Sequence, residues 1–444
     1  MSSFTFVAAG DSIITHRCSH KTDPAFLDLV KLIRQGDAAF VNFEIVTPRP
    51  PLVPSAEHGG VNLGVPEYVI DELKWMGFNL FSVANNHSND FTWKGLVDTL
   101  EALKQRAVVV AGGGMNLGEA RSPAYLDTDR VRVGFVGATS SYTVGAPAAA
   151  AREDFPGRPG ISHLRLDYEY VLDPQRFAAA SDMSEALGIA DLIRQRQKSS
   201  GTKPDENVID MMALKFVKGD APAIRCKMNT KDLDDICRWV NDAKRQAEFV
   251  VMSLHAHQGK GRRSNSAEMA DFIPEAAHRC IDAGADVFVG HGPHMLRACE
   301  VYKGRPVFYS LGNFFYRSSQ IVRYPAEIYD MVNIGPQSTP ADVVDTRTTD
   351  RDGNPRGFNT DIRFWQSVLP VCRYEDLRLK SIDLYPVELR LGAPHRAQRG
   401  EPHLADAAMG ADILKRLAEM SEPYGFKISI EPVGERVVGR ASWA

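Results

Sequence analysis

The sequence predicts an α/β fold with a largely parallel sheet. Two observations support this: short apolar runs of β-type composition alternate with stretches of helical periodicity, and several of the apolar runs end in polar side chains. Such alternation is typical of sheets whose strands are joined by helical crossovers. The chain has 444 residues, 44% of them apolar, which is enough for a sizeable core.

The first part of the chain alternates strands and helices in order. We expect strands at 4–11, 38–44, 79–87 and 107–114, and helices at 24–35, 66–77 and 93–106. Pro24 suits the first turn of its helix, where a missing N–H costs nothing. The last of these strands runs into a glycine turn.

The middle of the chain has a different character. Long polar and helical segments from about Phe177 to Ala243 predict a helical insertion. The strand pattern then returns at 247–257, 285–294 and 304–315, with a helix around 275–284. We therefore expect one domain over residues 1–390, with the insertion at about 177–243, and a C-terminal extension over 391–444. The stretch 317–356 has a loop-like composition, and 426–440 can form a hairpin.

The overall charge excludes some classes of partner. A net charge of −4 with both signs interspersed gives no field that would attract nucleic acid. The N-terminus lacks a secretion signal, and no apolar run reaches the roughly 18 residues of a membrane span. We expect a cytoplasmic protein without a membrane anchor. The six cysteines contain no CxxC pair, so neither a zinc knuckle nor a disulfide framework is indicated.

Polar side chains close five of the predicted strands. They are Asp11, Asn42 with Glu44, Asn86 with His87, His255 with His257, and His291 with His294. Ligands of open α/β sheets lie beyond the carboxyl ends of strands, so these residues are expected to meet at one site. Carboxylate, amide and imidazole groups suit borderline divalent ions, and two ions that share a carboxylate can activate water for hydrolysis. Any one of these residues alone is explained as well by a structural role, and the set is what indicates a metal centre.

Six motifs resemble those of a known family. They are GDSIITHR (10–17), VNFE (41–44), VANNHSNDF (83–91), SLHAHQG (253–259), GHGPHML (290–296) and YSLGNFF (309–315). In this order they resemble the CapA-like poly-γ-glutamate capsule biosynthesis family, which is similar to the calcineurin-like metallophosphatases. The resemblance extends to about Leu389. It implies a metallophosphatase-like α/β/β/α sandwich.

The resemblance also implies a role for each matching position. Two divalent ions, manganese, zinc or iron, would be held by Asp11 and His294 on one side, by Asn86, His255 and His291 on the other, and by Glu44 as the bridge. His87 would donate a proton to the leaving group. Two positions depart from the metallophosphatase pattern. Ile13 stands where a histidine is usual, with His16 as the candidate replacement, and Glu44 stands where the bridging residue is usually aspartate.

Other residues are secondary candidates for the site. Lys260, Arg262 and Arg263 follow a ligand strand and suit the carboxylate or phosphate of a substrate, although a solvated loop explains them as well. Asn313 can orient substrate or a ligand histidine, or simply form a turn. Asp90 can orient His87 or cap the helix that begins near Thr92.

Three functions are compatible with these features. The first is a soluble metal-dependent hydrolase that acts on an amide, lactone or ester bond of a small anionic substrate, such as a γ-glutamyl compound. The second is a non-catalytic accessory protein of poly-γ-glutamate synthesis or export, and the third is a phosphoesterase. Because the first strand begins almost at Met1, leaving no room for an anchor, we favour the enzyme.

Overall fold

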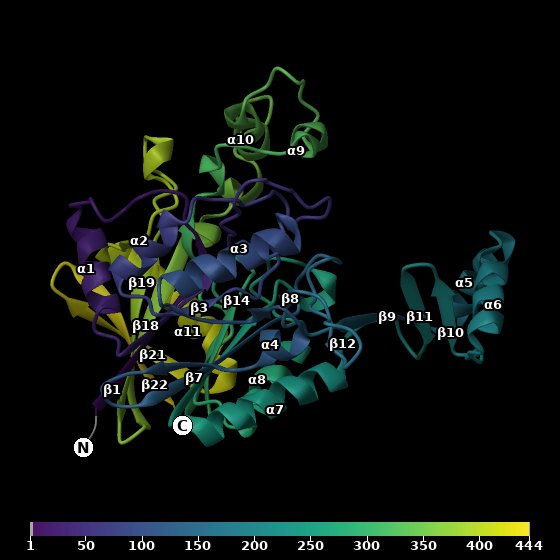
Figure 1. Cartoon of the computed structure of the whole chain (residues 1–444), viewed down its shortest axis with the longest axis horizontal. Helices are drawn as coiled ribbons and strands as arrows, with labels where there is room; N and C mark the ends of the chain where they lie inside the picture. The colour runs from purple at the N-terminus through teal and green to yellow at the C-terminus, as the bar shows by residue number, and fades with distance from the viewer. Residues whose placement is uncertain (1–2, 444) are drawn as a thin grey trace.

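Two mixed β-sheets pack face to face, with helices on both outer faces (Figure 1). The computed structural model describes residues 3–443. This arrangement is the expected α/β/β/α sandwich. It follows the strand order β21-β22-β19-β18-β1-β2-β3-β4 in the first sheet, with β17 beside β1 and β20 beside β19, and β15-β16-β14-β13-β7-β6 in the second.

The strands of the two sheets come from the whole length of the chain. The first sheet contains β1 (Ser3–Ile13), β2 (Ala38–Phe43), β3 (Leu80–Ser82), β4 (Val109–Ala111), β17 (Asn313–Tyr316), β18 (Gln366–Glu375), β19 (Arg378–Glu388), β20 (His403–Leu404), β21 (Phe426–Val433) and β22 (Arg436–Trp443). The second contains β6 (Ala124–Asp127), β7 (Arg132–Thr139), β13 (Phe249–His255), β14 (Val287–His291), β15 (Cys299–Tyr302) and β16 (Arg305–Phe308).

The helices form the outer layers. The first sheet is covered by α1 (Pro24–Ile33), α2 (Tyr68–Met76) and α3 (Thr92–Gln105), and the second by α7 (Thr230–Gln246) and α8 (Phe272–Asp282). The shorter helices are α4 (Leu117–Arg121), α9 (Ala326–Met331) and α10 (Pro340–Thr348), and α11 (Ala407–Ser421) packs into the core between the sheets.

Strand β1 shows why the sequence forms this sandwich. Its even residues Phe4, Phe6 and Ala8 face the core between the sheets, and its odd residues Val7 and Ala9 face the core under the helices. A strand buried on both faces reads as a continuous apolar run, which is what the sequence shows. The pairs β1–β2, β2–β3, β7–β13 and β13–β14 are all parallel, so their carboxyl ends lie at one edge of the sandwich.

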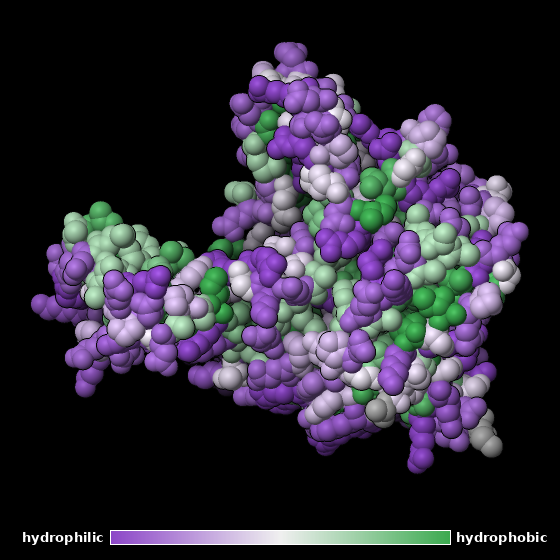
Figure 2. Space-filling model, turned by 180° about the vertical axis from the view of Figure 1, so that it is seen from behind, coloured by the Kyte–Doolittle hydropathy of each residue, from purple (hydrophilic) through white to green (hydrophobic). Residues whose placement is uncertain are grey.

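The insertion differs from the expected helical segment. It begins at β9 (Leu166–Leu172), contains α5 (Pro174–Ala186) and α6 (Ile189–Ser200), and continues with β10 (Val208–Met211), β11 (Leu214–Lys218) and β12 (Ala223–Met228). These strands form a separate four-stranded sheet in a lobe that stands away from the body (Figures 1 and 2). Helix α7 lies outside this lobe, because its apolar face of Leu233, Ile236 and Val240 packs on the second sheet.

The C-terminal residues complete the main domain. The expected hairpin forms as β21 and β22, and β22 pairs with β19 in the first sheet. Residues 403–443 thus supply β20, α11, β21 and β22 to the main domain. Within residues 3–443, none of the helices combines the length and apolarity that a membrane span requires. Two glycines, Gly113 and Gly114, form the short β5, which pairs with β8 (Gly160–Ile161).

Candidate metal centre

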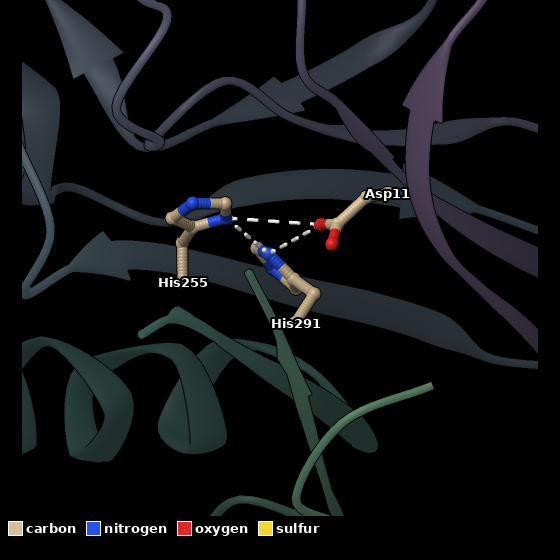
Figure 3. A group of neighbouring side chains, drawn as sticks. All are labelled: Asp11, His255 and His291. Atoms are coloured by element: carbon tan, nitrogen blue, oxygen red, sulfur yellow. Dashed lines mark hydrogen bonds and ion pairs between the residues drawn. The ribbon is translucent and has the colours of Figure 1, made fainter. Parts of the chain in front are cut away.

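The polar residues at the strand ends meet at one buried site between the two sheets. Asp11 lies in β1, Glu44 follows β2, and Asn86 follows β3, whereas His255 and His291 are the last residues of β13 and β14. All but Asn86, which is 8% exposed, are fully buried. Figure 3 shows Asp11, His255 and His291 pointing toward one another from three strands. The expected convergence is what the structure contains.

A close approach of two glycines sets the position of Asp11. The backbone N–H of Asp11 donates to the carbonyl of Gly312 at 2.9 Å, and Asp11 pairs with Asn313 across β1 and β17. A Cβ on Gly10 would lie 1.9 Å from that carbonyl oxygen, so only glycine permits the contact. This brings the GDS and SLGN motifs together.

Glu44 is the least satisfied group of the site. It is fully buried, and neither oxygen of its carboxylate has a hydrogen-bond partner. Burial, reinforced by the charge of Asp11, raises its pKa well above the usual value. A buried carboxylate without partners is costly unless a cation neutralises it. Glu44 therefore fits a divalent ion well.

The histidines present unprotonated nitrogens to these carboxylates. Burial is the main cause that lowers the pKa of His291 to about 3 and that of His257 to about 4, and it lowers the pKa values of His255 and His294 well below the usual value. Neutral imidazole is the form that binds metals. Burial likewise raises the pKa of Asp11. Burial thus disfavours both the ionised carboxylates and the protonated histidines of the site. A nearby cation would lower the pKa values of the carboxyl groups again and so favour their ionised form.

Three overlapping groups have the spacing of metal ligands. Within each group the ligand atoms lie within 4.8 Å of one another: Asp11 with His255 and His291, Asp11 with Glu44 and His294, and Glu44 with His255 and His257. The Nδ1 atoms of His255 and His291 are 2.9 Å apart, and His255 Nε2 is 2.8 Å from the amide oxygen of Asn86. All six expected ligands therefore lie around one centre.

The outward nitrogens of two of these histidines have their own partners. His294 Nδ1 donates to the Asn313 oxygen at 2.9 Å, while the amide of Asn313 donates to the carbonyls of His294 and Phe364. His291 Nε2 is 2.7 Å from the hydroxyl of Ser253. Such contacts orient ligand rings around a metal. Asn313 thus contacts a histidine of the centre rather than serving only as a turn residue.

His87 and Asp90 form a buried pair beside the centre. His87 Nδ1 is 2.7 Å from Asp90 Oδ2, which also accepts the backbone N–H of Leu63 at 2.7 Å. Helix α3 begins at Thr92 without a side-chain cap, so Asp90 orients His87 instead of capping the helix. Because Nδ1 faces Asp90, Nε2 is the nitrogen available to a proton-transfer partner.

A cavity of about 610 Å³ opens onto the centre. Its lining includes Asn86, His87 and His294 of the centre and the aromatic residues Tyr316, Phe358 and Trp365. Four arginines also line the cavity, namely Arg347, Arg356, Arg396 and Arg399, and none of the described lining residues is acidic. The stretch after 317, including α10, thus shapes the cavity, while the lobe of residues 166–228 contributes nothing to the lining.

The other basic candidates lie outside this cavity. His16 Nε2 is 2.7 Å from Glu401, which also pairs with Lys21 and Arg317, so His16 does not replace the missing histidine at Ile13. The three residues Lys260, Arg262 and Arg263 do not line the cavity. Arg262 stacks on Tyr168, and Arg263 pairs with Glu268. The solvated-loop explanation describes their surroundings better than substrate contact.

Sequence reasoning gave no specific role to the strand-end residues Asn42 and His257, and it missed the cavity arginines. Asn42 donates to Asp11 at 2.8 Å and lies 3.3 Å from His255 Nδ1. The cavity arginines are distant in sequence from every motif. His257 was grouped with the strand ends but given no role, although its spacing of two residues from His255 at a strand end was a usable signal.

Fold and site together define a class: an α/β/β/α sandwich of the metallophosphatase type, with buried acidic and histidine groups able to hold metal. Within that class the family is clear. Residues 5–318 match the family described as "Bacterial capsule synthesis protein PGA_cap", and the chain belongs to it.

Relatives of known name cover different shares of the chain. Two proteins of Sinorhizobium fredii named "Uncharacterized protein y4sH" and "Uncharacterized protein y4uA" are each 36% identical over 96% of this chain and 91% of their own length. The "Capsule biosynthesis protein CapA" of Bacillus anthracis is 24% identical over 68% of this chain and 58% of its own. The "Probable polyglutamine synthesis accessory protein Rv0574c" of Mycobacterium tuberculosis is 27% identical over 52% of this chain and 43% of its own.

Proposed function

We propose that this protein is a metal-dependent hydrolase that cleaves an amide, lactone or ester bond of a small anionic substrate. The observation that carries the proposal is Glu44, a fully buried carboxylate without a hydrogen-bond partner, surrounded by neutral histidines. Asp11 and His294 would hold one divalent ion, Asn86, His255 and His291 a second, and Glu44 would bridge them. Manganese, zinc or iron suits this mixed nitrogen and oxygen set. When bound, such ions polarise the scissile bond and lower the pKa of water.

The residues of the chain account for the remaining chemistry. His87 lines the cavity and presents Nε2, from which it donates a proton to the leaving group. Asp90 holds the ring in place through Nδ1. The cavity arginines attract an anionic group of the substrate, because none of the described lining residues is acidic; of the four, Arg396 is already paired with Asp345.

Metal content and turnover test the proposal separately. The metal-to-protein ratio of the purified chain should be near two by elemental mass spectrometry. We expect Glu44→Ala and His294→Ala to lose metal, and His87→Ala to keep metal but lose turnover of γ-glutamyl amides, lactones or esters. His278→Ala is the matched control, since His278 stacks on Tyr302 away from the centre. Wild-type protein without metal, or His87→Ala with full turnover, contradicts the proposal.

The names of the relatives support a second candidate. Relatives called capsule biosynthesis or accessory proteins favour a non-catalytic role in polymer synthesis or export. A chain that binds two ions but cleaves no amide, lactone, ester or phosphoester in the panel would favour that role. Cleavage of phosphoesters alone would identify a phosphoesterase at the same centre.

A further inference from the structure

His257 faces the centre from the first turn after β13. Its Nε2 is 3.3 Å from the Asn86 oxygen, and its ring centroid lies 4.9 Å from that of His255 and 5.2 Å from that of His294. The ligand atoms of Glu44, His255 and His257 lie within 4.8 Å of one another. Two ligands at about 2.0 to 2.2 Å from one ion lie at most about 4.4 Å apart, and the 3.3 Å between His257 Nε2 and the Asn86 oxygen is within that range. His257 is thus placed like a ligand, although the motif resemblance gives it no role.

The hydrogen bond on the far side of the ring fixes its tautomer. His257 Nδ1 is 2.6 Å from the side-chain oxygen of Asn265, to which it donates its proton. Nε2, which faces Asn86, is then left with a free electron pair. His294 has the same arrangement, with Nδ1 on Asn313 and Nε2 3.9 Å from Glu44. In both His257 and His294, an asparagine oxygen therefore accepts the Nδ1 proton and leaves Nε2 free to bind a metal.

Arg297 holds both sides of the loop that carries this pair. Its side chain is fully buried and donates to the carbonyls of Ala256, His257 and Gln258 at 3.0 to 3.2 Å, and to that of Ser266 at 2.9 Å. Three of these carbonyls belong to His257 and its two neighbours, and the fourth belongs to Ser266, the neighbour of Asn265. One guanidinium therefore fixes the spacing of His257 and Asn265, which a loop with a merely structural histidine would not require. Arg297 is a positioning residue.

We infer that His257 is a further metal ligand, binding through Nε2 the divalent ion beside Asn86, with Asn265 setting its tautomer. The inference rests on the proposed function, because it needs an ion at the centre. It adds a nitrogen donor that the resemblance does not assign.

Cobalt binding to the full-length, chelator-treated chain tests the inference without any assay of activity. Co²⁺ alone is titrated by calorimetry, and the visible absorption of the bound ion reports its ligands. We expect His257→Ala to weaken one of the two sites about tenfold or more and to change that spectrum. Added imidazole should restore the cobalt affinity and the visible spectrum of His257→Ala, because it can fill the space of the missing ring. His278→Ala is the matched control and should bind like wild type.

Two variants of Asn265 test the tautomer. Asn265→Asp keeps an acceptor for Nδ1 and should keep cobalt affinity, whereas Asn265→Leu removes it and should weaken the same site. These variants also serve if His257→Ala does not fold, as judged by circular dichroism. If Asn265→Asp and Asn265→Leu weaken cobalt binding equally, Asn265 does not set the tautomer of His257.

The outcomes separate this inference from the proposed function. If wild type binds two ions and His257→Ala binds them with unchanged affinity and spectrum, His257 is not a ligand, while the hydrolase proposal stands. If wild type binds no ion, both are wrong. Selective, imidazole-rescued loss in His257→Ala supports the inference whatever the substrate is.

Discussion

Replacing Glu401 with glutamine should destabilise the protein strongly and in a pH-dependent way. The Glu401 carboxylate is 2% exposed and accepts from Arg317 at 2.6 Å, from His16 at 2.7 Å and from Lys21 at 2.8 Å. Burial alone would raise its pKa, but these partners outweigh burial and lower the pKa to about 2. Arg317 is itself buried, and burial lowers its pKa only to about 10, so it stays charged at neutral pH.

The lowered pKa gives the magnitude. A fall of the pKa from its usual value of 4.5 to about 2 corresponds to about 3 kcal/mol of stability. Because the folded pKa is depressed, this contribution is fully present above the unfolded pKa and is lost as the pH falls through the folded value. We expect Glu401→Gln to lower the free energy of unfolding by about 3 kcal/mol at pH 7 and by about 2 kcal/mol at pH 3.5.

Urea unfolding of both proteins at the two pH values measures this difference. Glu435→Gln is the control, since Glu435 is exposed and should change little at either pH. A loss below about 1 kcal/mol at pH 7, which is the range of an exposed ion pair, would refute the reasoning. So would a loss that does not shrink on acidification.

Four further predictions concern the centre and its cavity. Gly10→Ala should prevent stable folding, because its Cβ would meet the Gly312 carbonyl, whereas Gly335→Ala, with open space around it, should unfold at the wild-type temperature. Chelation should lower the thermal unfolding temperature. In the chelated protein, acidification from pH 8 to 6 should raise the unfolding temperature of wild type relative to that of Glu44→Gln, because burial raises the pKa of Glu44 so that the folded state binds this proton more tightly. The buried histidines, whose lowered pKa values act in the opposite direction, are common to both proteins; a difference between the two proteins that does not change with pH contradicts this. Asp90→Asn should leave metal content unchanged but slow turnover about 100-fold, with exposed Asp129→Asn as control; full turnover would show that His87 needs no carboxylate. Arg347→Met should raise KM for anionic substrates more than for neutral ones, whereas Arg351→Met, outside the cavity, should raise neither.

The sequence by itself determined the layers of the fold and the core of the centre. Runs such as 6–9 are apolar at every position because the strand is buried on both faces, and this property is local to the chain. Polar residues at the ends of parallel strands must meet at one edge, so Asp11, Glu44 and His291 could be grouped without coordinates.

Only the tertiary structure decided which residues complete the site. His16 bonds to Glu401, which is 385 positions away, and the cavity arginines come from α10 and the loops after it. No periodicity links such residues, because their meeting depends on how loops close over the sheet edge. The insertion was misjudged for a related reason: its short strands form a sheet only with each other and lack the long apolar runs of a buried strand. Arg297 holds His257 near its partner Asn265. Its hydrogen bonds are all to backbone carbonyls, so no pattern of side-chain types in the sequence could indicate them.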